Sequence, residues 1–479
     1  MNGGIYSMNI YEHHEIKGWF FFPEDKDNPE KWVPGILKWD PAKGAEIELM
    51  GGLFPGFYYE VEQNGKSSPS GEVSGVVRPA DDVSPIPAMF LQTTKGNRYS
   101  IFNAQRGNYS ADLFTTEEHW HSTQVYVGDH VLPEEKTFTK ATFYIDELYY
   151  LVNQICQPKD DFQAGIFEGN TEDAHYSIKL PETRQRKHQR YGLEFTISLE
   201  ASVSITLRNQ KEVEELAGRA SNFVSNFAPI RDLMRLATFQ PCGVYCINLK
   251  QKDEDNNQFG SLLNEVGLTS DDVDPHPANI GHLLIKPKFG EIARPHERHN
   301  NKKVVFTLDD ISLENFLKER ERLTSNDGAS DYWDILIALC GYSPNYIEEY
   351  TNQSYSAAEG FHEQCLNGGD VLLKERFKNL YSRLPQEVQG QINFNANNWA
   401  ELAKNARHRV SHGRRLKRDD FTTSFDRYAV AVSVHLVTYL VVLNELGVPS
   451  EKICGALLNH PKISLAMSYC DKVRSMLES

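Results

Sequence analysis

The hydrophobic pattern of this chain changes its period once, and that change restricts the folds open to it. In residues 1 to about 210, short runs rich in aromatic and β-branched residues alternate with turn residues, as in antiparallel strands. From about residue 309, apolar residues recur every three or four positions, as on the buried face of a helix. A chain of 479 residues is also too long for one compact core. The sequence therefore predicts an α+β multidomain protein, in which an antiparallel, β-rich, sandwich-like domain precedes a C-terminal α-helical bundle.

Local signals place several elements and the domain boundary. Residues 35–51 read as a β-hairpin with a turn at 41–44, and Ser312 or an upstream Asp is a candidate N-cap for a helix. A helical spacing also occurs within 211–238, in the β-rich part, and CGVYCINLK reads as a strand. In the helical part, an apolar stripe on one helix is formed by Trp399, Leu402, Ala406 and Val410. Residues 291–303 are polar and basic, as in a connection between domains. We therefore expect two domains, at residues 1–300 and 301–479.

Composition limits the location of the protein and its partners. Its 40% hydrophobic and 24% charged residues are typical of a globular protein, and seven scattered cysteines do not suggest a disulfide framework. No signal peptide is visible, and the apolar stretch 428–443 is shorter than the roughly 20 residues that a bilayer needs. We therefore expect a cytoplasmic protein with no membrane segment, in which this stretch is a buried or interfacial helix.

One basic segment stands out against a formal net charge of −16, which argues against nonspecific attraction to nucleic acid. Residues 404–418, KNARHRVSHGRRLKR, contain seven Lys or Arg residues and two histidines, but no acid. Most charge runs are solvated faces. Here, however, His408 and His412 lie within the run, and Gly413 is suited to end a helix. The segment is therefore a candidate phosphate-binding site.

Arginine and histidine together suit RNA cleavage without a metal ion. When the 2′-hydroxyl of RNA is the nucleophile, a base must take its proton and an acid must protonate the leaving 5′-oxygen. Histidine titrates near neutral pH, and arginine grips a phosphate with two hydrogen bonds. No Walker loop, Rossmann fingerprint or Gly-x-Ser-x-Gly elbow is present. These residues therefore favour a ribonuclease over a nucleotide hydrolase or a serine hydrolase.

Two parts of the sequence resemble one family. Residues 407–412 resemble the motif of HEPN-domain ribonucleases, which is an Arg, a polar residue, a three-residue spacer and a His. The segment SAAEGFHEQCL, with Glu359, looks like the Ala-x-x-Glu helix of that family. GWFFFPEDKDNPEKWVPGILKW…IELMGG, within 18–52, is similar to the start of the N-terminal domain of ApeA-like anti-phage HEPN proteins. VGDH at 127–130 and the following FYIDELYYLV agree with the same domain.

This resemblance implies an abortive-infection effector of the bacterial cytoplasm. Such a protein is a homodimeric, metal-independent endoribonuclease that cleaves cellular RNA, with tRNA as a candidate, after a phage-derived trigger is sensed. It uses no cofactor, and its products carry 2′,3′-cyclic phosphate and 5′-hydroxyl ends. Arg407 would grip the scissile phosphate, His412 would transfer protons, and His408 would assist or orient, although this last position is often Asn in relatives. Substrate binding would fall to Lys404, Arg409, Arg414 and Arg415, with Glu359 as a supporting acid.

Geometry and chemistry leave alternatives open. Positions five apart on an ideal helix diverge by roughly 140°, so Arg407 and His412 converge only if the helix ends or distorts near His412, or if they belong to different chains. His408 and His412 also have the spacing of a zinc pair, although no third ligand is evident nearby. In a further alternative, the helical domain is a catalytically silent module that binds RNA or protein.

Other chemically active residues have ordinary explanations. His119 and His121 either share one face of a strand or lie in a surface loop, and we favour the loop. The basic run 184–190 is expected to be a solvated loop, and the alternative is a segment that guides RNA toward the cleft. Cys242 and Cys246 are expected to be buried thiols. His435 is expected to lie in the core or in a dimer interface.

Overall fold

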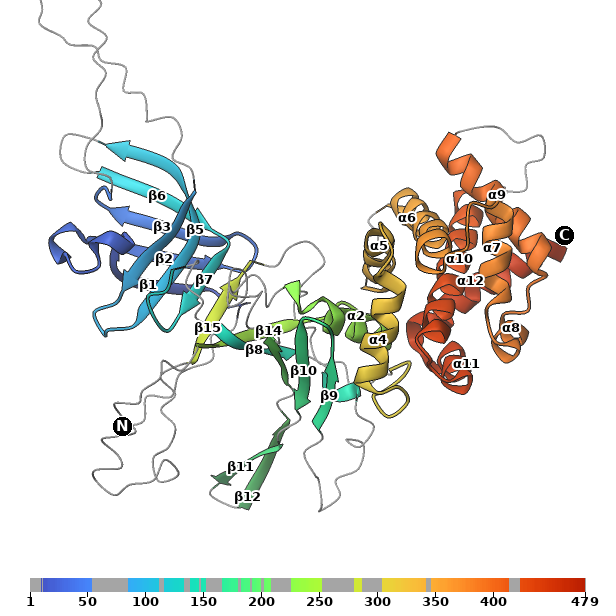
Figure 1. The fold of residues 1–479 in the computed structure, drawn as a ribbon, viewed down its shortest axis with the longest axis horizontal. Helices are drawn as coiled ribbons and strands as arrows, with labels where there is room; N and C mark the ends of the chain where they lie inside the picture. Colours follow the sequence, from blue (N-terminus) through green and yellow to red (C-terminus); the bar gives the residue numbers. More distant parts are fainter. Residues whose placement is uncertain are drawn as a thin grey trace, which may run out of the picture. The chain divides into compact units, whose positions relative to one another are not determined.

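The structure, a computed structural model, forms two compact units that are described separately below (Figure 1). The first unit is made of residues 1–141, 210–223 and 245–287, and the second of 142–209, 224–244 and 288–479. The residues that the structure describes are 10, 12–53, 85–111, 116–132, 138–145, 148–151, 166–179, 182–189, 192–199, 202–207, 225–251, 280–286, 304–341, 346–412 and 423–478.

The described elements follow the predicted change from strands to helices. The strands are β1 (His14–Phe21), β2 (Val33–Asp40), β3 (Gly44–Met50), β4 (Ile86–Gln92), β5 (Arg98–Ala111), β6 (Thr116–Ser122), β7 (Gln124–Val127), β8 (Phe138–Ile145), β9 (Ile166–Asn170), β10 (Ala174–Lys179), β11 (Glu182–Gln189), β12 (Gly192–Leu199), β13 (Ser202–Leu207), β14 (Val244–Gln251) and β15 (Ile280–Ile285). The helices are α2 (Ala228–Thr238), α4 (Leu313–Thr324), α5 (Ala329–Gly341), α6 (Ile347–Gly360), α7 (Leu373–Ser382), α8 (Gln386–Ile392), α9 (Ala396–His412), α10 (Ser424–Glu445), α11 (Ser450–Asn459) and α12 (Pro461–Glu478). The predicted α+β class, with β-rich and helical parts in that order, is confirmed.

Six antiparallel strands of the first unit close into a barrel. Their order is β4-β1-β2-β3-β6-β5, and β4 also pairs with β5, which completes the ring. The hairpin predicted at residues 35–51 is the β2–β3 pair. Its turn is held by Asp40, whose Oδ1 accepts a hydrogen bond from the Ala42 backbone N–H at 2.7 Å. Gly44 ends the turn with φ +93°, a conformation that favours glycine.

The inside of this barrel is apolar, with one buried ion pair. Trp39, Ile47 and Trp120 are at most 1% exposed, which follows from the period-2 alternation of their strands. Glu118 also lies inside, where Oε1 accepts a hydrogen bond from Arg106 Nη2 at 2.7 Å. Its other oxygen, Oε2, accepts from the Trp120 indole N–H at 3.3 Å. The buried carboxylate therefore has the charged and polar partners that make its burial tolerable.

Beyond the barrel, β5 continues to a further run of strands in the first unit. β5 pairs with β7, β7 with β15, and β15 with β14. The strand predicted at CGVYCINLK is β14, and Cys242 and Cys246 are each 1% exposed and not in disulfides. The prediction of two buried thiols is therefore confirmed.

The second unit carries strands in the order β8-β13-β10-β9, and β10 pairs antiparallel with both β13 and β9. Strand β9 packs closely on α4, because a Cβ on Gly169 would lie 2.8 Å from the Leu317 side chain. A separate hairpin is formed by β11 and β12. The basic run at 184–190, which we predicted to be a loop, instead forms most of β11. Its backbone pairs with β12 over the whole length of both strands, which a charge pattern does not reveal.

Helix ends in the second unit follow the local signals of the sequence. Ser312 caps α4 as predicted, and its side chain accepts a hydrogen bond from the Asn315 backbone N–H at 3.2 Å. The helix predicted within 211–238 is seen as α2, which ends at Phe239 in the left-handed conformation with φ +51°. The part of that prediction before residue 225, and the connection predicted at 291–303, lie outside the described residues.

A buried carboxylate joins three helices of the second unit. Asp232 on α2 is 0% exposed. Its Oδ2 accepts hydrogen bonds from Arg320 Nε of α4 at 2.7 Å and from the Trp333 indole of α5 at 2.8 Å. Its Oδ1 accepts from Arg231 Nε at 2.9 Å. Both oxygens of the Asp232 carboxylate thus accept hydrogen bonds from arginines, and Asp232 is the residue that joins α2, α4 and α5.

Helix α10 is the core helix of the helical domain. All residues from 429 to 443 are buried, as expected for a helix that is apolar on every side. Its 22 residues are long and apolar enough to cross a membrane, so our argument from length was wrong. However, 83% of its most apolar window is buried within the protein. The prediction of a buried helix is confirmed. Among the described residues, α10 is the one helix that is long and apolar enough to cross a membrane.

His435 lies in this core, as predicted, and should make stability depend on pH. Its Nδ1 is 2.8 Å from the Tyr350 hydroxyl oxygen, and burial lowers its pKa from 6.5 to about 4. The unfolded chain therefore binds the proton first, so the stability from the neutral imidazole is complete above pH 6.5 and is lost toward pH 4. Between pH 7 and pH 4.5, we expect His435→Gln to lose about 2 kcal/mol less unfolding free energy than the parent, measured with urea. Equal losses in both proteins would contradict this assignment.

Candidate active site

Helix α9 carries the candidate motif and is fixed to the helical core by its apolar stripe. Trp399 is fully buried, and its indole N–H donates to Ser433 Oγ of α10 at 3.0 Å. Leu402 and Ala406 are buried on the same side, as the helical spacing predicted. Val410, the last predicted member of the stripe, lies on the helix, but its side chain is outside the described part. The anchored face of α9 therefore determines where the motif residues leave the helix.

Arg407 and Glu359, which are far apart in the sequence, form an ion pair between α9 and α6. Arg407 Nε donates to Glu359 Oε1 at 2.7 Å, and the two side chains are 26% and 25% exposed. A guanidinium has five N–H donors, and this contact is made through Nε alone. The terminal nitrogens, which form the fork that binds a phosphate, take no part in it. The arrangement thus orients the Arg407 guanidinium at a partly exposed position.

The backbone around Glu359 is held tightly. At the next residue, Gly360, an added Cβ would lie 2.0 Å from the ring of Tyr332 on α5, so a larger residue would force the helices apart. A π-helical turn, Phe361–Cys365, follows directly and widens the end of α6. Such turns are rare and are often found at functional sites. Close packing and an irregular turn therefore set the position of the Glu359 carboxylate.

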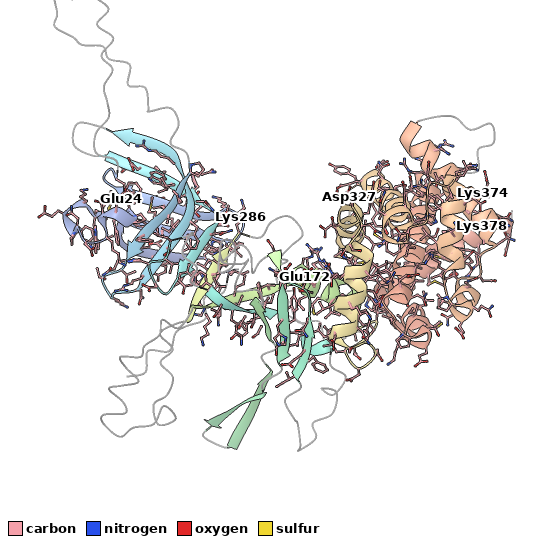
Figure 2. All side chains as sticks on the ribbon, viewed as in Figure 1. Glu24, Glu172, Lys286, Asp327, Lys374 and Lys378 are labelled. Carbon is pink, nitrogen blue, oxygen red and sulfur yellow. The ribbon has the colours of Figure 1, made fainter. Side chains whose placement is uncertain are left out.

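Lys404 lies one turn before Arg407, in a second charged cluster. Its Nζ donates to Glu401 Oε1 at 2.6 Å, and Lys374 of α7, labelled in Figure 2, lies 3.2 Å from Glu401 Oε2. The hydrogen bond from Lys404, followed by that from Lys374, lowers the pKa of Glu401. Sequence reasoning assigned Lys404 to the substrate and missed Glu401 and Lys374. The spacing of three residues between Glu401 and Lys404 is the signal that would have revealed their pairing.

The remaining predicted site residues are described to different extents. His408 and Arg409 lie on α9 next to Arg407, and both are partly exposed. His412 is the last residue of α9, so the helical backbone continues through the motif, but its side chain lies outside the described part. Arg414 and Arg415 lie outside it altogether. The structure thus brings Arg407 and Glu359 together and leaves the predicted roles of the other residues as predictions.

The described side chains contain no candidate metal centre. No group of three or more His, Cys, Asp or Glu residues there is placed to hold a metal ion. The zinc alternative at His408 and His412 would need the His412 side chain, which is not among them.

His119 and His121 lie on the outer face of the barrel. They belong to β6, so the loop that we favoured is wrong and the strand alternative is confirmed. Trp120 between them points inward and is fully buried, because neighbouring residues on a strand face opposite sides. The two histidines lie opposite Glu48 and Glu46 of β3, in a shallow pocket on the barrel surface. Each histidine therefore faces a carboxylate across the strands.

Comparisons with known proteins identify both parts of the chain. Residues 15–320, which are more than half of the 479, match the family model of ApeA N-terminal domain 1. Residues 345–452 match the family model described as Apea-like HEPN, and they include α6, the π-helical turn and α9. No curated protein and no solved structure matches the chain.

Proposed function

Since this chain belongs to the ApeA family of HEPN-domain proteins, we propose that it is a metal-independent endoribonuclease that cleaves cellular RNA during phage infection. HEPN domains are generally ribonucleases, and the ApeA-like type is associated with anti-phage defence. The β-rich N-terminal part would sense a phage-derived trigger or restrain the nuclease. We propose tRNA as the substrate class and the cytoplasm as the compartment.

One observation carries this proposal. Arg407 stands on the anchored helix α9, within the segment that matches the HEPN family, and is oriented by Glu359 from α6. A cation that only docked nucleic acid would need no such partner, because nonspecific attraction depends on charge rather than direction. A group that stabilises a transition state must be held in place before the reaction. The Arg407–Glu359 pair therefore supports catalysis over simple docking.

The reaction follows from the chemistry of these residues. Arg407 binds the scissile phosphate and stabilises the charge that develops when the 2′-oxygen attacks. A histidine takes the proton from the 2′-hydroxyl, and a proton is delivered to the leaving 5′-oxygen. His412 is the principal proton-transfer residue in this scheme, and His408 assists or orients it. The P–O5′ bond breaks as the P–O2′ bond forms, leaving a 2′,3′-cyclic phosphate and a 5′-hydroxyl.

The active site would be shared between two copies of the chain. Because α9 is helical through His412, the positions of Arg407 and His412 diverge by roughly 140° around its axis. Because α9 ends at His412, convergence within one chain would depend on the last turn of the helix. We propose instead a homodimer in which Arg407 of one chain works with His412 of the other, as the family resemblance implies. Lys404, Arg409, Arg414 and Arg415 would guide the RNA into this shared cleft.

The proposal is tested with purified protein and total bacterial tRNA in excess EDTA, beside the His412→Ala variant. We expect discrete fragments from the parent only, with 2′,3′-cyclic phosphate and 5′-hydroxyl ends. Cleavage that EDTA abolishes would instead support a metal site at His408 and His412. If the parent binds RNA but does not cut it, even with phage-infected extract added as a source of trigger, the helical domain is a silent binding module.

A further inference from the structure

Tyr355 carries a buried hydroxyl that has no hydrogen-bond partner among the described residues. The residue lies on α6 and is 0% exposed. Other buried tyrosines of the same domain are satisfied: Tyr381 donates to the Gln389 carbonyl at 3.1 Å, and Tyr439 donates to the Leu236 carbonyl at 2.7 Å. An unpaired buried hydroxyl costs free energy that a phenylalanine would avoid. The hydroxyl of Tyr355 therefore needs an explanation beyond packing.

The position of Tyr355 next to Glu359 explains why a hydroxyl is present there. It lies four residues before Glu359 on the same helix, and residues at this spacing are neighbours on one face. Side chains on a helix lean toward its N-terminus, so the Glu359 side chain leans toward Tyr355. The charges of both members of the ion pair reach the hydroxyl: burial raises the pKa of Tyr355, the Arg407 charge lowers it, and the Glu359 charge raises it. The Tyr355 hydroxyl thus lies on the same helix face as Glu359, which orients Arg407.

We infer that Tyr355 is a positioning residue, whose hydroxyl donates a hydrogen bond to the Glu359 carboxylate when Arg407 turns to the RNA phosphate. This inference rests on the proposed function, because it assigns a role within the same site. In the protein without RNA, Arg407 donates a hydrogen bond to the Glu359 carboxylate, and the Tyr355 hydroxyl does not. When the terminal nitrogens of Arg407 bind the phosphate, the guanidinium shares its charge with that anion and stabilises the partly buried carboxylate less. The hydroxyl then compensates for that loss, so that Glu359 stays ionised and continues to hold Arg407 in line.

The test is Tyr355→Phe, which removes only the hydroxyl. Without the hydroxyl, Arg407 is less well aligned with the charge that develops in the transition state, so we expect kcat to fall about tenfold with KM unchanged. Thermal unfolding should occur at the same temperature as in the parent or higher, because an unpaired group is lost. A merely structural hydroxyl would give the reverse: a lower unfolding temperature with an unchanged kcat.

Tyr381→Phe is the matched control. Its hydroxyl donates to the Gln389 carbonyl and accepts from the Phe394 N–H at 3.0 Å, so the variant should unfold at a lower temperature and keep its kcat. If the parent cleaves RNA and Tyr355→Phe cleaves it equally fast, the inference on Tyr355 fails while the proposed function stands. If the parent and His412→Ala are equally inactive in every condition, both fail.

Discussion

Mixing the Arg407→Ala and His412→Ala proteins is expected to restore cleavage, although each variant alone is inactive. Removing Arg407 deletes the phosphate clamp, and removing His412 deletes the proton carrier, so each loss should cost at least about a thousandfold in rate. In a shared site, however, the intact Arg407 of one chain meets the intact His412 of the other. Restored activity is therefore the direct signature of an active site built from two copies.

The size of the recovery can be calculated. When two variants exchange freely at equal amounts, half of the symmetric dimers are mixed, and each mixed dimer has one intact site of two. The mixture should thus reach about a quarter of the parental rate. The rate is measured on tRNA after the proteins are incubated together, and mixed dimers are counted by native mass spectrometry with one variant isotopically labelled.

The matched control mixes Arg407→Ala with a double variant that lacks both Arg407 and His412. These dimers form equally well, but they contain no intact pair and should remain inactive. If mixed dimers are present and the first mixture is also inactive, each site is built within one chain. If either single variant cuts RNA at the parental rate, the assignment of that residue is wrong.

Asp232→Ala is expected to cause the largest loss of stability in the second unit. The substitution leaves Arg320 and the Trp333 indole without the acceptor that they share. It also removes the acceptor of Arg231, so that α2, α4 and α5 lose their common hydrogen-bond partner. Breaking a buried charged pair typically costs 3–5 kcal/mol, so we expect a loss of about 4 kcal/mol in unfolding free energy. Urea unfolding followed by circular dichroism of the helices measures it.

Asp334→Ala provides the comparison for that experiment. Asp334 also accepts from Arg231, at 2.7 Å, but its side chain is 61% exposed. An exposed ion pair contributes at most about 1 kcal/mol, so this variant should remain close to the parent. Equal losses at the two positions would mean that Asp232 is not the anchor that joins α2, α4 and α5.

The sequence predicted the elements that local signals determine. The turn at 41–44, the Ser312 cap and the apolar stripe of α9 each depend on a few neighbouring residues, and each is confirmed. Closure of the barrel depends instead on the pairing of β1 with β4 and of β3 with β6, which lie far apart in the sequence, and no local pattern encodes it. The basic run in β11 was misjudged for a related reason. Its charges suggested solvent, whereas its pairing with β12 makes it a strand.

The candidate site was predicted in part. The family resemblance, which the comparisons confirm, singled out Arg407 and Glu359 from segments 48 residues apart. That the two side chains touch follows from how α6 packs on α9, which spacing alone does not determine. The π-helical turn after Glu359 and the unpaired hydroxyl of Tyr355 are also consequences of packing. Sequence thus indicated the chemistry of the site, and tertiary structure supplied its geometry.

Closure of the barrel limits how a foreign protein can be recognised by it. Many binding domains capture a partner by β-augmentation, in which an extended peptide adds itself to an exposed sheet edge. In the ring β4-β1-β2-β3-β6-β5, every strand has a neighbour on both sides, although β4 pairs only with Trp19–Phe21 of β1. If the barrel senses a phage product, as we propose, its paired strands favour recognition through side chains, such as the glutamates and histidines on β3 and β6. Recognition by side chains depends on the sequence of the product, so a phage could escape it by substituting a few surface residues.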